Sequence, residues 1–136
     1  MDKEYVEIDL KEYLVEDADP KELARSLEQR TKKFAVNIIR LSAKLPKTAE
    51  SIVIRNQLTK AGTSIGANYR EANRARSRSD FKSRIKICES EANETLYWLE
   101  IVNDLKWTSE EESNPLINEC SELLAIYSSI GKKLNH

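Results

Sequence analysis

Only six of the 136 residues are glycine or proline, and this scarcity constrains the fold more than any other feature. These two residue types interrupt helices and strands and build turns, and proteins on average use them for about 12% of positions. The chain therefore has few places at which a regular segment must end. We expect long helices joined by short connections, in one domain, because this length suits a single core.

Apolar residues recur at helical spacing in four segments, of which the first two lie in the N-terminal half. The first covers about residues 20–45, with Asp19 as its N-cap and Pro46 just beyond its end. The second covers about residues 49–76, and Thr48 stands where an N-cap is expected. In each segment the large apolar residues fall on one side of a helix, as a helix that covers a core requires.

The other two segments lie in the C-terminal half. The third covers about residues 78–106 and begins at Ser77 and Asp80, which have the spacing of a capping box. The fourth covers about residues 115–134, with Asn114 as N-cap and Pro115 in its first turn. Four amphipathic helices with short connections predict an all-α fold, an antiparallel up-and-down four-helix bundle over residues 20–136.

The charges are unevenly distributed, although the formal net charge is only −1. Residues 1–20 carry eight acidic and two basic side chains, a net charge of −6, whereas residues 21–136 carry a net charge of +5. Residues 70–86 alone carry seven basic and two acidic side chains, so we expect the positive excess to be concentrated there. Residues 1–19 are predicted to be an acidic arm. Such asymmetry indicates what the protein binds rather than how it folds.

The basic residues around the end of the second segment form the predicted binding site. Three of its arginines, Arg70, Arg74 and Arg78, are spaced by four residues. On one continuous helix their side chains fall within an arc nearly opposite the core face. Clustered basic side chains neutralise phosphates without needing special spacing, which predicts a sequence-nonspecific contact with RNA or DNA. The alternative is a solvated helix face that pairs with neighbouring acidic residues. The candidate contacts are Arg70, Arg74, Arg78, Lys60 and Lys82.

Gly62 and Gly66 lie one turn apart on a flank of the second segment, between its core face and its arginines. Each glycine in a helix interior costs about 1 kcal/mol relative to alanine. Close packing against another helix or subunit offsets such a cost, because a residue without a side chain lets another backbone approach. A kink at the glycines is the alternative.

The third segment has a second apolar group besides its core stripe. Ile87, Trp98, Ile101 and Leu105 lie together about 120° away from that stripe. A bundle helix needs only one apolar face, so this group predicts burial against another subunit. The alternative is a wide core-facing stripe that also covers the connections.

The sequence contains no run of 18 apolar residues, so we expect no membrane-spanning helix. Its first residues are acidic and lack the basic-then-apolar order of a signal peptide, which favours the cytoplasm. In that reducing compartment Cys88 and Cys120 are expected to be small buried apolar residues.

Catalysis is not expected, because the one histidine is His136, the last residue given. Serine and cysteine hydrolases need a histidine base, and di-metal carboxylate bundles need Glu-x-x-His pairs on facing helices. The glycines also lack the Gly-Lys-Ser/Thr ending of a phosphate-binding loop. We therefore expect neither an enzyme nor a metal ion or other cofactor.

Three stretches, in order, resemble the family of ribosomal RNA intervening-sequence proteins. They are KKFAVNIIRLSAKLPKT at residues 32–48, NQLTKAGTSIGANYREANRARSRSDF at 56–81 and SEANETLYWLE at 90–100. The chain is also similar to the accessory variability proteins of diversity-generating retroelements. The resemblance covers about residues 22–105 and implies a four-helix bundle that assembles into a ring-like homopentamer. Two departures are Asn93, where an acidic residue is common, and the acidic arm, which the shared pattern lacks.

Two functions are open at this point. The first is an oligomeric adaptor that binds nucleic acid through the face that carries Arg70, Arg74 and Arg78. The acidic arm is able to fold back over this face and cover it. The second is a protein–protein scaffold that, as the resemblance implies, docks a reverse transcriptase or a ribosomal component. Its candidate anchors are the aromatic residues Trp107, Tyr5 and Tyr13.

Overall fold

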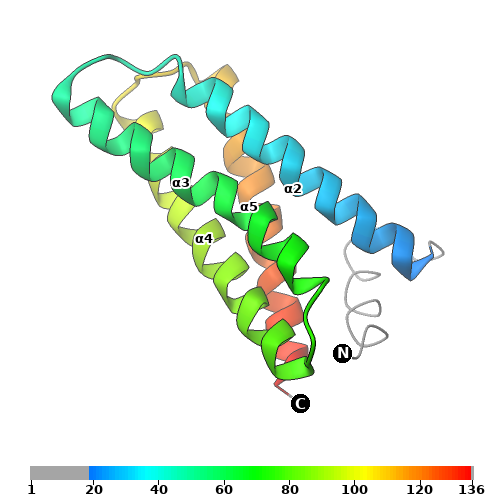
Figure 1. Cartoon of the computed structure of the whole chain (residues 1–136). Coiled ribbons are helices and arrows are strands. Elements are labelled where there is room, and N and C mark those ends of the chain that lie inside the picture. The colour runs from blue at the N-terminus through cyan, green and yellow to red at the C-terminus, as the bar shows by residue number, and fades with distance from the viewer. Residues whose placement is uncertain (1–18, 136) are drawn as a thin grey trace.

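A computed structural model describes residues 19–135 of the chain, and these residues form four α-helices without strands. The helices are α2 (Pro20–Ser42), α3 (Ala49–Ala72), α4 (Arg78–Asp104) and α5 (Glu110–Leu134). Each helix runs antiparallel to the one before it (Figure 1), so the described part of the chain is an all-α, up-and-down bundle. None of these four helices is long and apolar enough to cross a membrane. The acidic arm before Asp19 lies outside the described residues.

Three of the predicted N-caps are confirmed by hydrogen bonds. The Asp19 carboxylate accepts from the backbone N–H of Lys21 at 3.0 Å. The Thr48 hydroxyl accepts from the backbone N–H of Ser51 at 3.2 Å. The Ser77 hydroxyl accepts from the backbone N–H of Asp80 at 3.0 Å. These side chains satisfy N–H groups that have no partner within their own helix, which fixes where α2, α3 and α4 begin.

The start predicted for the last helix is wrong. α5 begins at Glu110 and not at Pro115, which lies inside the helix, and the N-cap is Ser109 rather than Asn114. The Ser109 hydroxyl accepts from the N–H of Glu112 at 3.2 Å. Three glutamates occupy the first turn, where negative charge interacts favourably with the positive end of the helix dipole. This strong start outweighs the preference of proline for the first turn.

The other three helices end earlier than predicted, at Ser42, Ala72 and Asp104. After α2 the backbone turns through residues 43–45, and Leu45 remains buried although it is no longer helical. After α3 the chain turns through residues 73–77 and enters α4. That second turn matters most, because it separates basic residues that the sequence pattern places on one helix.

The core lies between the four helices, and α2 packs along α3, α3 along α4, and α4 along α5. α2 and α5 are the least closely packed neighbours. The two free cysteines are buried in the core, as predicted, and each thiol donates to a backbone carbonyl of the neighbouring helix. Burial raises the pKa of both Cys88 and Cys120 to about 12. Both groups are therefore neutral thiols near pH 7 and poor nucleophiles.

Candidate nucleic-acid interface

The two glycines of α3 set its distance from α2. A Cβ atom placed on Gly62 meets Cγ2 of Ile38 at 2.8 Å, and one placed on Gly66 meets Oγ1 of Thr31 at 3.0 Å. Ile38 and Thr31 are fully buried residues of α2. The two helices approach closely at this point because the glycines have no side chains. The element that packs against the glycines is thus α2 of the same chain.

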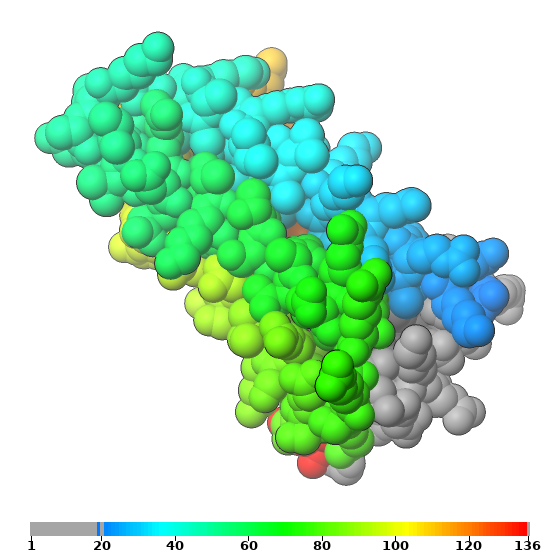
Figure 2. Space-filling view, viewed as in Figure 1, coloured from blue at the N-terminus to red at the C-terminus, as the bar shows by residue number. Residues whose placement is uncertain are grey.

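Two shallow clefts lie between α2 and α3, one on each side of the glycine contact. The first, of about 270 Å³, is lined by Arg25, Glu28, Gln29, Lys32 and Arg70. The second, of about 400 Å³, is lined by residues that include Ile39, Thr59, Arg55 and Lys60. We call these two clefts and the surface between them the α2–α3 groove. Figure 2 shows that α2 and α3 together form one broad face of the molecule.

Five basic side chains and one acidic side chain line this groove. The acidic residue is Glu28, which accepts a hydrogen bond from the Asn73 amide at 2.8 Å and lies 3.8 Å from the Arg70 guanidinium. The Arg70 side chain is 56% exposed, so this ion pair is solvated and contributes little to holding it. The groove therefore keeps a large positive excess. Its basic residues are Arg25, Lys32, Arg55, Lys60 and Arg70.

The arginines predicted to share one helix face do not share a helix. α3 ends at Ala72, so Arg70 is helical, Arg74 lies in the turn, and Arg78 is the first residue of α4. All three are exposed, but the Arg78 guanidinium donates to the backbone carbonyl of Leu134 at 2.7 Å. Arg78 thus satisfies a carbonyl at the end of α5 and has a structural role. The predicted arc assumed helical geometry through Arg78, two residues beyond the predicted end of the second segment at residue 76.

The two predicted lysines also separate. Lys60 is exposed on α3 and lines the second cleft of the groove. Lys82 is half-buried on α4, away from the residues that line the groove. Of the five predicted contacts, the structure therefore brings Arg70 and Lys60 to one groove and leaves the others outside it.

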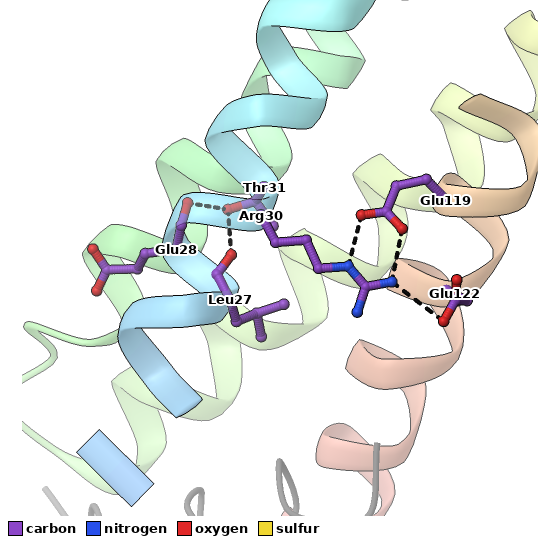
Figure 3. Close-up of polar contacts among 6 residues, drawn as sticks. All are labelled: Leu27, Glu28, Arg30, Thr31, Glu119 and Glu122. Carbon is purple, nitrogen blue, oxygen red and sulfur yellow. Dashed lines mark hydrogen bonds and ion pairs between the residues drawn. The ribbon is translucent and has the colours of Figure 1, made fainter. Parts of the chain in front are cut away.

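Arg30 is a basic residue of α2 that faces away from the groove. Its Nε and Nη2 atoms donate to the two carboxylate oxygens of Glu119 on α5 at 2.6 and 2.7 Å, and Nη2 lies 3.3 Å from Glu122 (Figure 3). The hydrogen bonds that Arg30 donates to Glu119 are the main cause of the raised pKa of Arg30. Such a two-point contact fixes geometry as well as charge. Arg30 thus joins α2 to α5 across the least closely packed pair of helices.

The sequence profile of the 23S rRNA-intervening sequence protein family matches residues 26–129. The chain belongs to this family. It is also similar to a crystal structure described as a protein of unknown function from the S23 ribosomal protein family of Bacteroides thetaiotaomicron VPI-5482. The two are 36% identical with a TM-score of 0.73, over 80% of this chain and 97% of that chain. No curated protein matches the chain.

In this member of the intervening-sequence family, the two halves of the bundle have opposite charge. Residues 20–77, which contain α2 and α3, carry thirteen basic and four acidic side chains, a net charge of +9. Residues 78–135, which contain α4 and α5, carry seven basic and eleven acidic side chains, a net charge of −4. The positive excess is therefore not concentrated in residues 70–86. It extends over the whole α2–α3 half.

Sequence analysis missed three residues of the groove, namely Arg25, Lys32 and Arg55. A signal for them was present, because α2 has six basic and two acidic side chains. The net charge of each helix, taken separately, shows this basic excess of α2. The net charge of residues 70–86 does not include α2 and therefore does not show it. Successive helices of an up-and-down bundle are also neighbours, so α2 and α3 were bound to share a surface.

The second apolar group of α4 is partly a core element and partly exposed. Trp98 and Ile101 are half-buried, and Trp98 packs against the core cluster. Ile87 and Leu105 are 41% and 50% exposed. The indole of Trp98 also lies against the exposed ring of Tyr97, with 5.0 Å between ring centroids. Ile87, Trp98, Ile101 and the C-cap Leu105 thus form a discontinuous row along one side of α4, which we call the apolar patch; Ile87 lies about 16 Å before Trp98 along the helix axis.

Proposed function

We propose that this protein is a non-catalytic, homo-oligomeric adaptor of the cytoplasm that binds nucleic acid through the α2–α3 groove. The observation that carries the proposal is the net charge of +9 on the α2–α3 half, with five basic side chains in one groove. Basic side chains bind phosphates and release their counterions, which favours binding to any RNA or DNA backbone. The family description, which names a segment of 23S rRNA, makes RNA the first nucleic acid to test.

The proposed contact is nonspecific in sequence. Arginine and lysine in the groove reach phosphates, which fix position without reading bases. Tyr69, the aromatic residue nearest the arginine cluster in sequence, is fully buried against Tyr127, with 5.5 Å between the rings. It is therefore not a platform on which a base is able to stack. The groove offers charge and shape, and these favour a backbone ligand.

The salt dependence of RNA binding tests this function. A labelled single-stranded RNA of about 20 nucleotides should bind at 50 mM salt, and log K should fall linearly with log salt concentration. Five phosphate contacts on a single strand predict a slope of about −3.5 for each open groove, and a shallower slope where RNA must displace an acidic segment of the chain. Fluorescence anisotropy at several salt concentrations measures both quantities. If no binding occurs at low salt, the scaffold function with a protein partner, such as a reverse transcriptase or a ribosomal component, replaces this proposal.

We also propose that the apolar patch on α4 is the subunit contact of a homopentameric ring. Ile87 and Leu105 each expose a large aliphatic side chain, and such exposed apolar area favours association. A head-to-tail contact between different surfaces closes into a ring when its rotation permits. The apolar patch is one of the two surfaces of such a contact, and none of its residues lines the α2–α3 groove.

Sedimentation velocity tests the ring. At micromolar concentration the wild-type chain should sediment at five times its monomer mass of 15.6 kDa. Ile87→Glu with Leu105→Glu should sediment as the monomer, because buried unpaired carboxylates oppose association. Val36→Glu, a change at an exposed apolar residue of α2, is the control and should remain pentameric. A wild-type monomer under these conditions contradicts the ring.

A further inference from the structure

We propose that the α2–α3 groove is the docking site of the acidic arm of the same chain, residues 1–18, which excludes nucleic acid from it. The docking depends only on the groove and the arm. The exclusion of nucleic acid rests on the function proposed above. The arm is thus an internal competitor that occupies the groove at low ionic strength.

Charge selects the groove for the arm. Residues 1–18 carry seven acidic and two basic side chains, a net charge of −5. The groove carries five basic side chains and one acidic side chain, Glu28. The α4–α5 half carries a net charge of −4 and repels the arm. Within the described residues, the α2–α3 half therefore attracts the arm and the α4–α5 half does not.

The arm has the length that docking needs. It joins the bundle at Asp19, and Arg25, in the first cleft, lies less than two helical turns further along α2. From Arg25 to Ile39, in the second cleft, the groove follows α2 for 14 residues, or about 21 Å. Eighteen residues span at most about 60 Å. The arm is therefore able to reach back along the entire groove.

Apolar residues in and near the second cleft favour a peptide over a nucleic acid as the resting occupant of the groove. Ile39 lines this cleft and is 49% exposed. Val36, about one turn before Ile39 on α2, is 38% exposed, and Ile52, about one turn before Arg55 on α3, is 48% exposed. The arm contains the alternating sequence YVEIDL at residues 5–10, in which Val6, Ile8 and Leu10 share one side of an extended chain. A phosphate backbone has no apolar side chains to cover these residues. The arm supplies both acidic and aliphatic groups.

Distance measurements on the full chain test the docking without nucleic acid. Ile8→Cys with Gln29→Cys places one spin label on the arm and one in the first cleft, and Ile8→Cys with Ser90→Cys places the second label on α4. The native thiols of Cys88 and Cys120 are buried and stay unlabelled near pH 7. Labelled chain is diluted into unlabelled chain so that only distances within one chain are measured. The label pair 8–29 should give a shorter and narrower distance distribution than the label pair 8–90. The differences in mean distance and in width should both vanish at 1 M salt, where charges are screened beyond about 3 Å.

Affinity measurements test the competition. Neutralising the arm with Glu4→Gln, Glu7→Gln, Asp9→Asn and Glu12→Gln should strengthen binding of single-stranded RNA at 50 mM salt by about tenfold. The matched control removes four negative charges from α4 with Glu89→Gln, Glu94→Gln, Glu100→Gln and Asp104→Asn. It should change the affinity by less than about threefold, because these residues lie outside the groove.

The outcomes separate this inference from the proposed function. A short distance to position 29 with no RNA binding by any variant supports docking and contradicts the nucleic-acid function. RNA binding that both sets of substitutions strengthen equally contradicts the competition. Equal distances from the arm to positions 29 and 90 overturn the docking itself.

Discussion

Replacing Gly62 with alanine should lower the free energy of unfolding by about 1 to 3 kcal/mol, although alanine forms helices better than glycine. The added Cβ atom meets Cγ2 of Ile38 at 2.8 Å and Cγ1 of the same residue at 3.0 Å. Ile38 is fully buried and branched at Cβ, so no rotation moves both atoms away at once. α2 and α3 must separate, and that displacement loosens the core on both sides of the contact.

The same substitution at Gly131 is the matched control. Gly131 is a buried residue of α5, but among residues 19–135, its own helix backbone and chain neighbours aside, no atom lies within 4 Å of a Cβ placed on it. Gly131→Ala should therefore raise the free energy of unfolding by up to about 1 kcal/mol through helix propensity alone. Urea unfolding of the three proteins at one chain concentration measures the difference. If both alanine variants shift the midpoint in the same direction, the glycine contact does not hold α2 and α3 together as described.

A double-mutant cycle identifies Ile38 as the cause. Ile38→Ala alone removes buried methyl groups and should destabilise the protein by about 2 to 5 kcal/mol. In the Gly62→Ala background the same change also removes the clash. The double variant should therefore be destabilised by about 1 kcal/mol or more less than the sum of the two single variants. If the two changes in the free energy of unfolding simply add, the strain of Gly62→Ala arises at a residue other than Ile38.

Much of the fold follows from local signals that the sequence displays. Thr48, and Ser77 with Asp80, stand at helix starts with the spacing that capping requires, and the structure places their hydrogen bonds as expected. The start of α5 was misplaced because Asn114 and Pro115 outweighed Ser109, which is followed by acidic residues. Two valid local signals competed, and the Ser109 cap with three glutamates in the first turn prevailed.

The end of α3 is harder to predict for a physical reason. The stretch from Asn73 to Asp80 contains neither glycine nor proline, so no residue in it forbids a continuous helix. The chain turns there because Ala72 and Phe81 are both buried in one core and belong to antiparallel helices. The cap at Ser77 marks where α4 begins, whereas the end of α3 at Ala72 depends on packing between distant segments. The turn redirects Arg78 to the end of α5, which no local pattern indicates.

The candidate site depends partly on long-range contacts and partly on charges that the sequence displays. The contact between Arg30 and Glu119 joins residues 89 positions apart and has no local signature. It removes one arginine of α2 from the groove. Arg25 and Lys32 were within reach of sequence analysis, because consecutive helices in a bundle share a surface and α2 is basic throughout. The net charge of the whole helix, rather than the density of one cluster, identifies them.

Reversing two charges of the groove should reduce RNA affinity more than reversing two charges outside it. Arg25→Glu with Arg70→Glu removes two of the five basic side chains and adds two acidic ones in the first cleft. Each charge-assisted contact contributes about 1.5 kcal/mol or more, so the loss should be about a hundredfold at 50 mM salt. Both residues are exposed, and neither is buried in the core. The fold should therefore be retained, which thermal unfolding checks.

The matched variant changes the net charge by the same amount on the other half of the bundle. Lys86→Glu with Lys132→Glu alters exposed lysines of α4 and α5. Any loss that arises only from total charge affects both variants equally. The variant on α4 and α5 should stay within about threefold of the wild-type affinity, because its charges are distant and screened.

The most direct measurement is the ratio of the affinities of these two charge-matched variants for one single-stranded RNA at 50 mM salt. Binding through the α2–α3 groove predicts that the Arg25→Glu, Arg70→Glu protein binds at least about thirtyfold more weakly than the Lys86→Glu, Lys132→Glu protein. Equal affinities, or a greater loss in the lysine variant, would contradict that assignment.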